Sequence, residues 1–226
     1  MPHVCTHNFP PLFGDGYELE KTAAVVLAGG VSSRFGQDKG LLSLAGKPLV
    51  RHVVDRIGKI ADEKIVVVSS QSQAEIYAKV LKSEARVYVD KEKLHGPVVG
   101  ALTGFENIHC EYSLLLPCDT PFMSKDILSL MLELCVNKNA AIPRWPNCYI
   151  EPLQAAYATE SALETARELL TESKTDMQLM VNTLRNVRYV STLVLQQLDP
   201  ELNTFFNINT PLDLKRAENI LKHARR

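Results

Sequence analysis

The sequence predicts one α/β domain in which helices cover both faces of a mostly parallel, mixed sheet. Short, continuously apolar segments rich in β-branched residues recur in the first half of the chain, and such segments are typical of strands buried on both faces. Segments with apolar residues at helical spacing separate them, and this alternation indicates βαβ units in three layers. The 226 residues are enough for a single domain of this kind.

The first half of the chain supplies the centre of the predicted sheet. Its four strands are expected at 23–28, 64–70, 86–90 and 112–119. The intervening helices are expected at 48–60, 72–82 and, after the fourth strand, 124–136. The last of these begins at Ser124, whose hydroxyl group suits a helix N-cap.

The second half is less regular. Strands are predicted over 139–143, 152–158 and 187–192, and helices over 160–171 and 175–185. A final helix begins at Thr210 and runs to about Lys222, because a capping hydroxyl is followed by proline and then by an acid in the first turn. Residues 1–22 show no periodicity and are predicted to be an irregular N-terminal arm before a domain over 23–226.

Composition excludes several classes of protein. Lysine and arginine number 25 against 26 acidic residues, so no overall positive field exists to bind nucleic acid. No apolar segment is long enough to span a membrane. Residues 1–22 lack the features of a secretory signal, so we expect a cytoplasmic protein. The five cysteines are not spaced as metal ligands.

The strongest local signal is LAGGVSSRFGQDK at 27–39, directly after the first strand. This position is the carboxyl end of the strand, and open α/β folds bind their ligands at the carboxyl edge of the sheet. Gly29 and Gly30 allow the backbone to approach a phosphate, while Arg34 and Lys39 supply positive charge. The spacing matches neither a P-loop nor a dinucleotide fingerprint. A simple glycine turn with solvated charges is the alternative interpretation.

These residues resemble a known family. The segment at 27–49 is similar to the signature of nucleotidyltransferases that attach a nucleotide to the molybdenum cofactor, above all the molybdenum cofactor guanylyltransferase family. The resemblance covers about residues 22–222 and implies a Rossmann-like fold of the nucleotidyltransferase type. Further matching segments follow in the same order, namely Val89-Asp90, Gly96-Pro97 with Gly100 opening a helix, LLLPCDTPF at 114–122, EPLQAAY at 151–157 and NINTP at 207–211.

The resemblance implies an Mg²⁺-dependent enzyme that transfers GMP from GTP to the terminal phosphate of molybdopterin and releases pyrophosphate. It also implies transient contact with cofactor-delivery proteins or molybdoenzymes. Two alternatives remain at this point. One is a related transferase that uses CTP or another phosphorylated acceptor, and the other is a nucleotide-binding protein without turnover. Lys39 and Asp119 argue against the latter, since a pure binder need not retain both.

Site residues follow from the motifs. Lys39 and Arg34 are expected to be catalytic, since charge neutralisation dominates transfer between two anions. Asp119, after an apolar strand, is expected to bind magnesium, with a turn cap as the alternative. Ser69 stands where the family often has asparagine, which weakens the case for guanine. The expected nucleotide-binding residues are Leu27, Ala28, Gly29, Gly30, Lys39, Ser69, Asp90, Gly96, Pro97 and Asp119.

Two of these expectations have structural alternatives. Asp90 matches an acid that contacts the nucleotide in the family, and could instead form a turn. Asn207 and Asn209 flank Ile208 at the end of a predicted strand, where alternate side chains face one side. The resemblance places acceptor binding at these two amides. The alternative is that both amides satisfy backbone groups at the start of the final helix.

Overall fold

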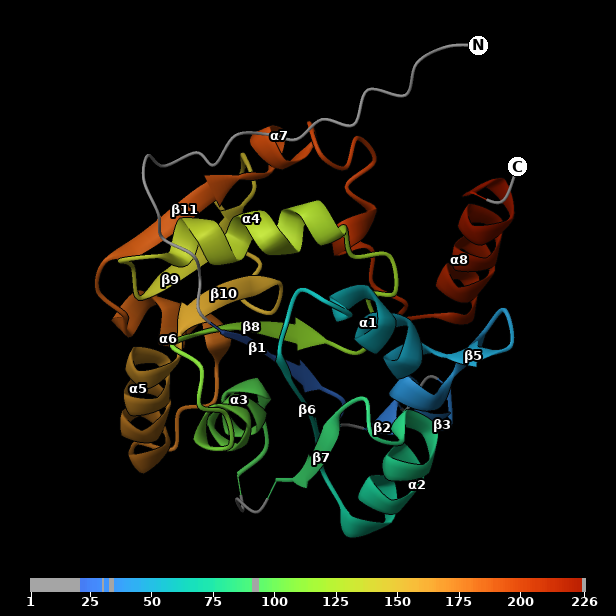
Figure 1. Cartoon of the computed structure of the whole chain (residues 1–226), viewed down its shortest axis with the longest axis horizontal. Coiled ribbons are helices and arrows are strands. Elements are labelled where there is room, and N and C mark those ends of the chain that lie inside the picture. The colour runs from blue at the N-terminus through green and yellow to red at the C-terminus, as the bar shows by residue number, and fades with distance from the viewer. Residues whose placement is uncertain (1–20, 30, 33–34, 91–93, 225–226) are drawn as a thin grey trace.

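The computed structural model describes residues 21–29, 31–32, 35–90 and 94–224. Within these residues the main sheet has seven strands in the order β11-β9-β10-β8-β1-β6-β7 (Figure 1). β10 is antiparallel to both of its neighbours and every other pairing is parallel, so the sheet is mixed, as predicted. The strands are β1 (Thr22–Leu27), β6 (Glu63–Val68), β7 (Arg86–Val89), β8 (Tyr112–Pro117), β9 (Ala140–Arg144), β10 (Ala155–Ala158) and β11 (Val187–Ser191).

The central strand β1 shows why its sequence is apolar without alternation. It pairs in parallel with β6 on one side and β8 on the other. Ala24 and Val26 belong to the core on one face, and Val25 to the core on the opposite face. All three are fully buried, so both faces of this strand lie in the core and its sequence does not alternate.

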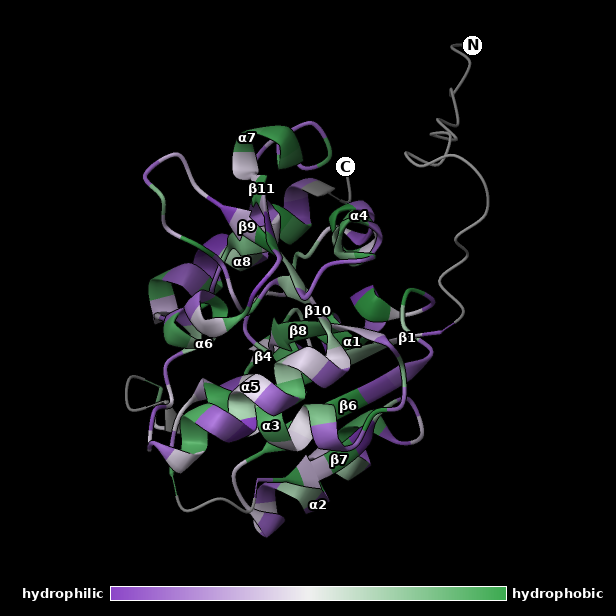
Figure 2. Cartoon of the chain, turned by 90° about the vertical axis from the view of Figure 1, so that its left-hand side faces the viewer, coloured by the Kyte–Doolittle hydropathy of each residue, from purple (hydrophilic) through white to green (hydrophobic). Residues whose placement is uncertain are grey.

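Helices cover both faces of the sheet, which gives the predicted three layers (Figure 1). One face packs against α1 (Leu49–Ile57), α2 (Gln71–Leu81) and α4 (Lys125–Cys135). The other packs against α3 (Pro97–Glu106), α5 (Thr159–Thr171) and α6 (Met177–Thr183). Figure 2 shows α3 and α5 side by side, with hydrophilic residues on the outer surface of α5. No helix among the described residues is long and apolar enough to cross a membrane.

A smaller apolar cluster fixes the segment after β1 to the C-terminal helix α8 (Pro211–Ala224). Leu44 and Leu49 pack there with Ile208 and Ala217. The sequence did not predict the short elements of this segment, because two-residue strands have no periodicity. They are β2 (Val31–Ser32), β3 (Gln37–Asp38), the 3-10 helix η1 (Lys39–Leu41), β4 (Ser43–Leu44) and β5 (Lys47–Pro48).

Predicted helix starts agree with the structure, but one predicted strand is wrong. Ser124 Oγ accepts a hydrogen bond from the Ile127 amide at 3.5 Å, as expected of an N-cap. Residues 206–209 are not a strand, and follow the 3-10 helix η2 (Asn203–Phe205) without regular structure. The reason is that no strand ladder holds them. Ile208 donates a single backbone bond, 3.0 Å long, to the carbonyl of Asp119.

The edges of the domain differ slightly from the prediction. β1 begins at Thr22, one residue earlier than expected, and β10 begins at Ala155 because residues 151–154 form a turn. The Gln154 amide donates to the carbonyl of Glu151 in that turn, at 3.3 Å. The short helix α7 (Thr192–Leu195) follows β11 directly. The predicted N-terminal arm falls almost entirely on residues 1–20, outside the described residues.

Candidate active site

The carboxyl ends of β1, β6, β7 and β8 meet at a cavity of about 580 Å³. Sequence segments far apart in the chain supply its walls, as expected at this edge of a parallel sheet. Gly30 and Arg34, predicted for the same site, lie outside the described residues. The remaining residues predicted to bind the nucleotide all line this cavity, namely Leu27, Ala28, Gly29, Lys39, Ser69, Asp90, Gly96, Pro97 and Asp119.

Gly29 lies where β1 and β6 end side by side. A Cβ atom at this position would lie 2.4 Å from Ser69 Oγ, closer than real Cβ contacts allow. The Ser69 amide donates to Gln73 Oε1 at 2.9 Å, which fixes the end of β6 to the first turn of α2. Any larger residue would therefore displace the Ser69 hydroxyl group, whereas glycine leaves the backbone at this edge open to a ligand.

The opposite wall is formed by the end of β7 and the start of α3. Thr103 Oγ1 donates to Asp90 Oδ1 at 3.3 Å, which ties this carboxylate to α3. Gly96 precedes α3 with φ of 149°, and a Cβ there would lie 2.5 Å from Thr175 Cβ. Pro97 takes the first helical position, where a missing amide hydrogen costs nothing. These contacts give the cavity a rigid rim.

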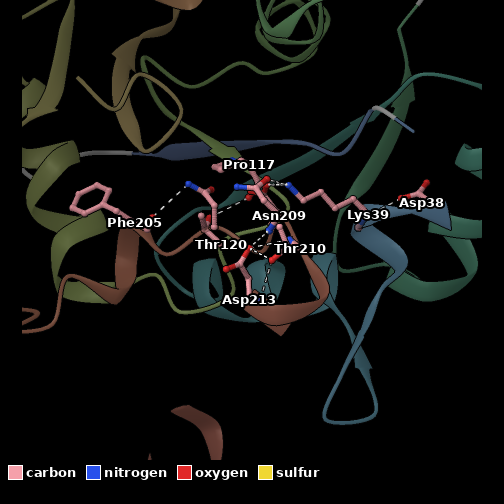
Figure 3. A network of polar contacts seen from close by, with 11 residues as sticks. Asp38, Lys39, Pro117, Thr120, Phe205, Asn209, Thr210 and Asp213 are labelled. Atoms are coloured by element: carbon pink, nitrogen blue, oxygen red, sulfur yellow. Dashed lines mark hydrogen bonds and ion pairs between the residues drawn. The ribbon is translucent and has the colours of Figure 1, made fainter. Parts of the chain in front are cut away.

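At the centre, Lys39 joins the loop after β1 to two other parts of the chain (Figure 3). Its ammonium group is ion-paired with Asp119 and donates to Asn209 Oδ1 at 2.6 Å. The lysine and aspartate side chains are only 20% and 15% exposed. A cation, a carboxylate and an amide from three segments thus converge at one point of the cavity.

Asp119 keeps one oxygen free within this cluster. Oδ2 pairs with Lys39, whereas Oδ1 is buried and has no hydrogen-bond partner. Thr120 closes the turn that follows, because its hydroxyl donates to the carbonyl of Pro117 at 3.4 Å. Among the described residues no group of three or more histidine, cysteine, aspartate or glutamate side chains could hold a metal. A single free carboxylate oxygen suits Mg²⁺, which takes its other ligands from water and substrate phosphates.

Asp38 holds the lysine loop from behind. Its Oδ1 accepts hydrogen bonds from the Gly40 amide at 2.9 Å and from the hydroxyl of Tyr77 at 2.6 Å. Its Oδ2 accepts from Gln73 Nε2 at 2.7 Å. Tyr77 is fully buried, and a Cβ on Gly40 would lie 2.2 Å from its hydroxyl oxygen. The clamp therefore fixes the backbone on both sides of Lys39 against α2.

A second cavity, of about 390 Å³, adjoins the first and shares Pro97, Pro117, Asp119 and Leu153 with it. Asn207 and Asn209 both line it, although they do not lie on a strand. The Asp213 side chain, and not an asparagine, binds the free backbone amides at the start of α8. Its Oδ2 accepts hydrogen bonds from the amides of Asn209 and Thr210 at 3.1 and 2.9 Å. The asparagine side chains are thus not needed to cap α8, and Asn207 Nδ2 donates to the backbone carbonyl of Phe205 at 3.4 Å.

Comparison with known proteins identifies the family. Residues 24–187 match the family described as "MobA-like NTP transferase domain". The chain belongs to this family. A relative from Methanosarcina mazei, named "Probable molybdenum cofactor guanylyltransferase", is 33% identical over 208 residues, which are 90% of this chain and 91% of the relative.

Solved structures agree with this membership. Molybdopterin-guanine dinucleotide biosynthesis protein A from Archaeoglobus fulgidus has a TM-score of 0.76 and 29% identity, and the match covers 89% of this chain and 99% of that one. The 4-diphosphocytidyl-2C-methyl-D-erythritol synthase from Anaerococcus prevotii has a TM-score of 0.68 at 14% identity, over 89% and 96% of the chains. The latter likeness shows only that the fold is shared.

Several residues of this MobA-like site were missed by the sequence analysis. Asp38 stood in the quoted motif beside Lys39, but its partners Gln73 and Tyr77 lie on a helix whose packing the sequence does not reveal. His95, which the sequence favours as a surface-loop histidine, is exposed and also lines the first cavity. Cys118, by contrast, is buried beside Asp119 as the sequence predicts for a cysteine at a strand end, and burial raises the pKa of its thiol, so it is not poised as a nucleophile.

We expect Tyr77→Phe to lower kcat more than it raises the KM for GTP. The change removes one hydrogen bond to the Asp38 carboxylate, which costs about 1.5–3 kcal/mol when the acceptor is charged. The loop then holds Lys39 less firmly in the transition state. Steady-state kinetics check this, with Tyr112→Phe as a control that removes a hydroxyl remote from the cavity. A kcat equal to that of the control would show that the clamp serves stability alone.

Proposed function

We propose that this protein transfers the GMP portion of GTP to the terminal phosphate of molybdopterin. An oxygen of the acceptor phosphate attacks the α-phosphorus of GTP, the bond to the β-phosphate oxygen breaks, and pyrophosphate leaves. The contact of Lys39 with both Asp119 and Asn209 carries the proposal, because it joins the two cavities at one point. The names of the Methanosarcina mazei and Archaeoglobus fulgidus relatives support this choice of substrates.

Each cavity takes one reactant in this proposal. The guanine nucleotide lies in the first cavity, with Gly29 near its phosphates and Ser69, Asp90, Gly96 and Pro97 around the nucleoside. The acceptor lies in the second cavity, along Asn207 and Asn209. Both reactants are anions, so catalysis depends on positioning and on neutralising charge at the α-phosphate. Gly30 and Arg34 stay predictions for the same phosphates.

Lys39 and Asp119 have different roles in neutralising this charge. Lys39 exchanges its contact with Asp119 for the phosphate oxygens, where its charge stabilises the transition state. Asp119, with its free oxygen, is the residue that would hold Mg²⁺. Magnesium, when bound, neutralises the triphosphate and polarises the transferring phosphoryl group.

We extend the proposal to the setting of the reaction. The near balance of 25 basic and 26 acidic residues supports the absence of a nucleic-acid partner. A cytoplasmic location fits an enzyme of cofactor assembly that consumes GTP. Transient contact with proteins that deliver molybdopterin or accept the finished cofactor fits a product that must be handed on.

Pyrophosphate release tests the proposal directly. The protein is incubated with molybdopterin, Mg²⁺ and each of GTP, CTP, ATP and UTP in turn. We expect release with GTP, little with the others, and none when molybdopterin is omitted. Equal or faster release with CTP would favour the related cytidylyltransferase. Binding of GTP without any release would favour a protein that binds the nucleotide without turnover.

We expect Asn207→Ala to raise the KM for molybdopterin while leaving the affinity for GTP nearly unchanged. Losing one buried hydrogen bond costs about 1–3 kcal/mol, or roughly a 5-fold to 150-fold change, and here it falls on one ligand only. Calorimetry with GTP and transfer kinetics with varied molybdopterin measure the two effects. Asn139→Ala, outside both cavities, is the control. Equal loss of GTP binding would assign Asn207 to the nucleotide or the fold.

Asn209→Ala differs because Asn209 Oδ1 accepts from Lys39 at 2.6 Å. We expect the KM for molybdopterin to rise as in Asn207→Ala, and kcat to fall as well, since the lysine loses one of its two fixed contacts. The same kinetic series measures both. An unchanged KM and kcat would remove Asn209 from the site.

A further inference from the structure

The acceptor cavity has an unusual charge pattern for a site that takes a phosphorylated substrate. Three carboxylates line it, from Asp119, Glu151 and Asp176. None of its described lining residues is lysine or arginine. The acceptor phosphate therefore belongs at the boundary where Asn209 meets Lys39. The body of the cavity favours a group that presents hydrogen-bond donors.

Glu151 has a carboxylate that is held in place and can accept further hydrogen bonds. The indole of Trp145 donates to its Oε1 at 2.7 Å, and this tryptophan packs edge-on against Phe205 with ring centroids 5.6 Å apart. No described lysine or arginine forms an ion pair with Glu151. Burial raises the pKa of this carboxyl group. A carboxylate accepts several hydrogen bonds, so Glu151 remains free to accept more from a ligand.

Gln154 supplies a second unmatched group three residues later. It is only 2% exposed, lines the same cavity, and its Nε2 has no hydrogen-bond partner. A buried amide without a partner lowers the stability of the protein, so its presence calls for a functional reason. Rotation about the last side-chain bond lets the amide present either its NH₂ or its oxygen to a ligand.

Tyr149 adds an aromatic surface to the same segment. Tyr149 lines the cavity and is 55% exposed. Its backbone carbonyl accepts from the Trp145 amide at 2.8 Å, so the loop that carries it is tied to the partner of Glu151. An exposed aromatic ring at a cavity wall favours stacking on a flat heterocycle.

We propose that Glu151 and Gln154 form a subsite for the amino-oxo edge of the acceptor's pterin ring, with Tyr149 against the ring face. This edge carries an exocyclic amino group and a ring N–H, which both donate to Glu151, beside a carbonyl that accepts from the Gln154 amide. The paired donors match a carboxylate in the bidentate manner. The inference rests on the proposed function, since it takes molybdopterin as the acceptor.

Binding of two small pteridines tests the subsite without any transfer reaction. 6-Hydroxymethylpterin carries the amino-oxo edge, and 6-hydroxymethyllumazine has oxygen in place of the amino group. Titrations followed by pteridine fluorescence should show that the wild-type protein prefers the pterin by about tenfold or more. Glu151→Gln should reduce this preference to about twofold or less, because an amide cannot accept both donors. Glu164→Gln, an exposed residue of α5, should leave it unchanged.

Gln154→Met separates a binding role from a structural one. Methionine keeps the length of the side chain and removes the unmatched amide. We expect affinity for both pteridines to fall about fivefold or more, since both carry the oxo group. Thermal unfolding should occur at the same temperature or higher. A lower unfolding temperature, or unchanged affinity, would overturn the role of Gln154.

The outcome is independent of the proposed function, because the fragments carry no phosphate and no GTP is present. A wild-type protein that does not discriminate the two pteridines, or a Glu151→Gln variant that still does, overturns the subsite even if GMP transfer to molybdopterin is observed. Discrimination by the wild type that is lost in Glu151→Gln supports the subsite. Absence of GMP transfer would then overturn the proposed function alone.

Discussion

Replacing Lys39 by methionine is expected to lower kcat for GMP transfer by about a hundredfold or more, because one charge contact to a transition state is lost. Methionine keeps most of the side-chain length and removes the ammonium group. In the structure this group contacts both Asp119 and Asn209 at the junction of the two cavities. Pyrophosphate release at saturating GTP and molybdopterin measures the effect on the chemical step.

The control for this change is Lys47→Met. Lys47 is also ion-paired with an aspartate, Asp55, but lies outside both cavities. We expect near-normal turnover in this variant, and thermal unfolding of both variants shows whether either has lost its fold. Near-normal turnover in Lys39→Met as well would remove the lysine from the chemistry.

The sheet and its ligand-binding edge could be predicted from the sequence for physical reasons. Strands such as β1 and β8 are buried on both faces, so their apolar runs are unmistakable and imply parallel pairing. Once parallel pairing is accepted, the residues that follow each strand must lie at one edge. This reasoning placed Gly29 and Asp119 at that edge, and the family resemblance added Ser69; all three line one cavity.

The antiparallel placement of β10 could not be predicted in the same way. AAYA is a short apolar run that suits parallel and antiparallel pairing equally well. Ala156 pairs with Leu114 of β8 and with Ala141 of β9, both antiparallel. The direction of β10 depends on how the segment between β9 and β10 leads the chain back into the sheet, and this is a property of the tertiary structure.

The alternation in Asn207-Ile208-Asn209 was misleading for a related reason. One apolar residue between two amides is compatible with a strand, but a strand also needs a neighbour with which to form a ladder. The segment instead packs Ile208 into the small cluster beside α8 and makes one backbone bond to Asp119. Both asparagines still line the acceptor cavity, so their predicted position was right although their secondary structure was wrong.

Contacts that depend on helix packing or on loop conformation could not be predicted from the sequence. The Asp38 clamp requires Tyr77, 39 positions away, to face the lysine loop. Glu151 and Gln154 belong to EPLQAAY at 151–157, a segment that the family resemblance placed near the acceptor without a role for either side chain. Their unmatched hydrogen-bonding groups become visible only when the surrounding side chains are in place.

Asp119→Asn is expected to raise the Mg²⁺ concentration needed for half-maximal turnover by about tenfold or more, because an amide keeps the shape but loses the charge that holds a divalent cation. Turnover at saturating Mg²⁺ should also fall. Folding should change little, since the amide oxygen can still accept from Lys39, and Oδ1 has no partner to lose. Pyrophosphate release over a Mg²⁺ titration measures both effects.

Asp126→Asn is the matched control for this last change. Asp126 lies in the first turn of α4 and away from both cavities, so its variant should titrate with Mg²⁺ like the wild type. An Asp119→Asn curve that overlays these two would mean that Asp119 serves only to pair with Lys39. That result would not affect the role of the lysine, because neutralising Asp119 leaves the ammonium group more available to the phosphates. Lys39→Met and Asp119→Asn therefore test two roles separately. The first tests the charge of the lysine, and the second tests the Mg²⁺ ion that the Asp119 carboxylate is proposed to hold.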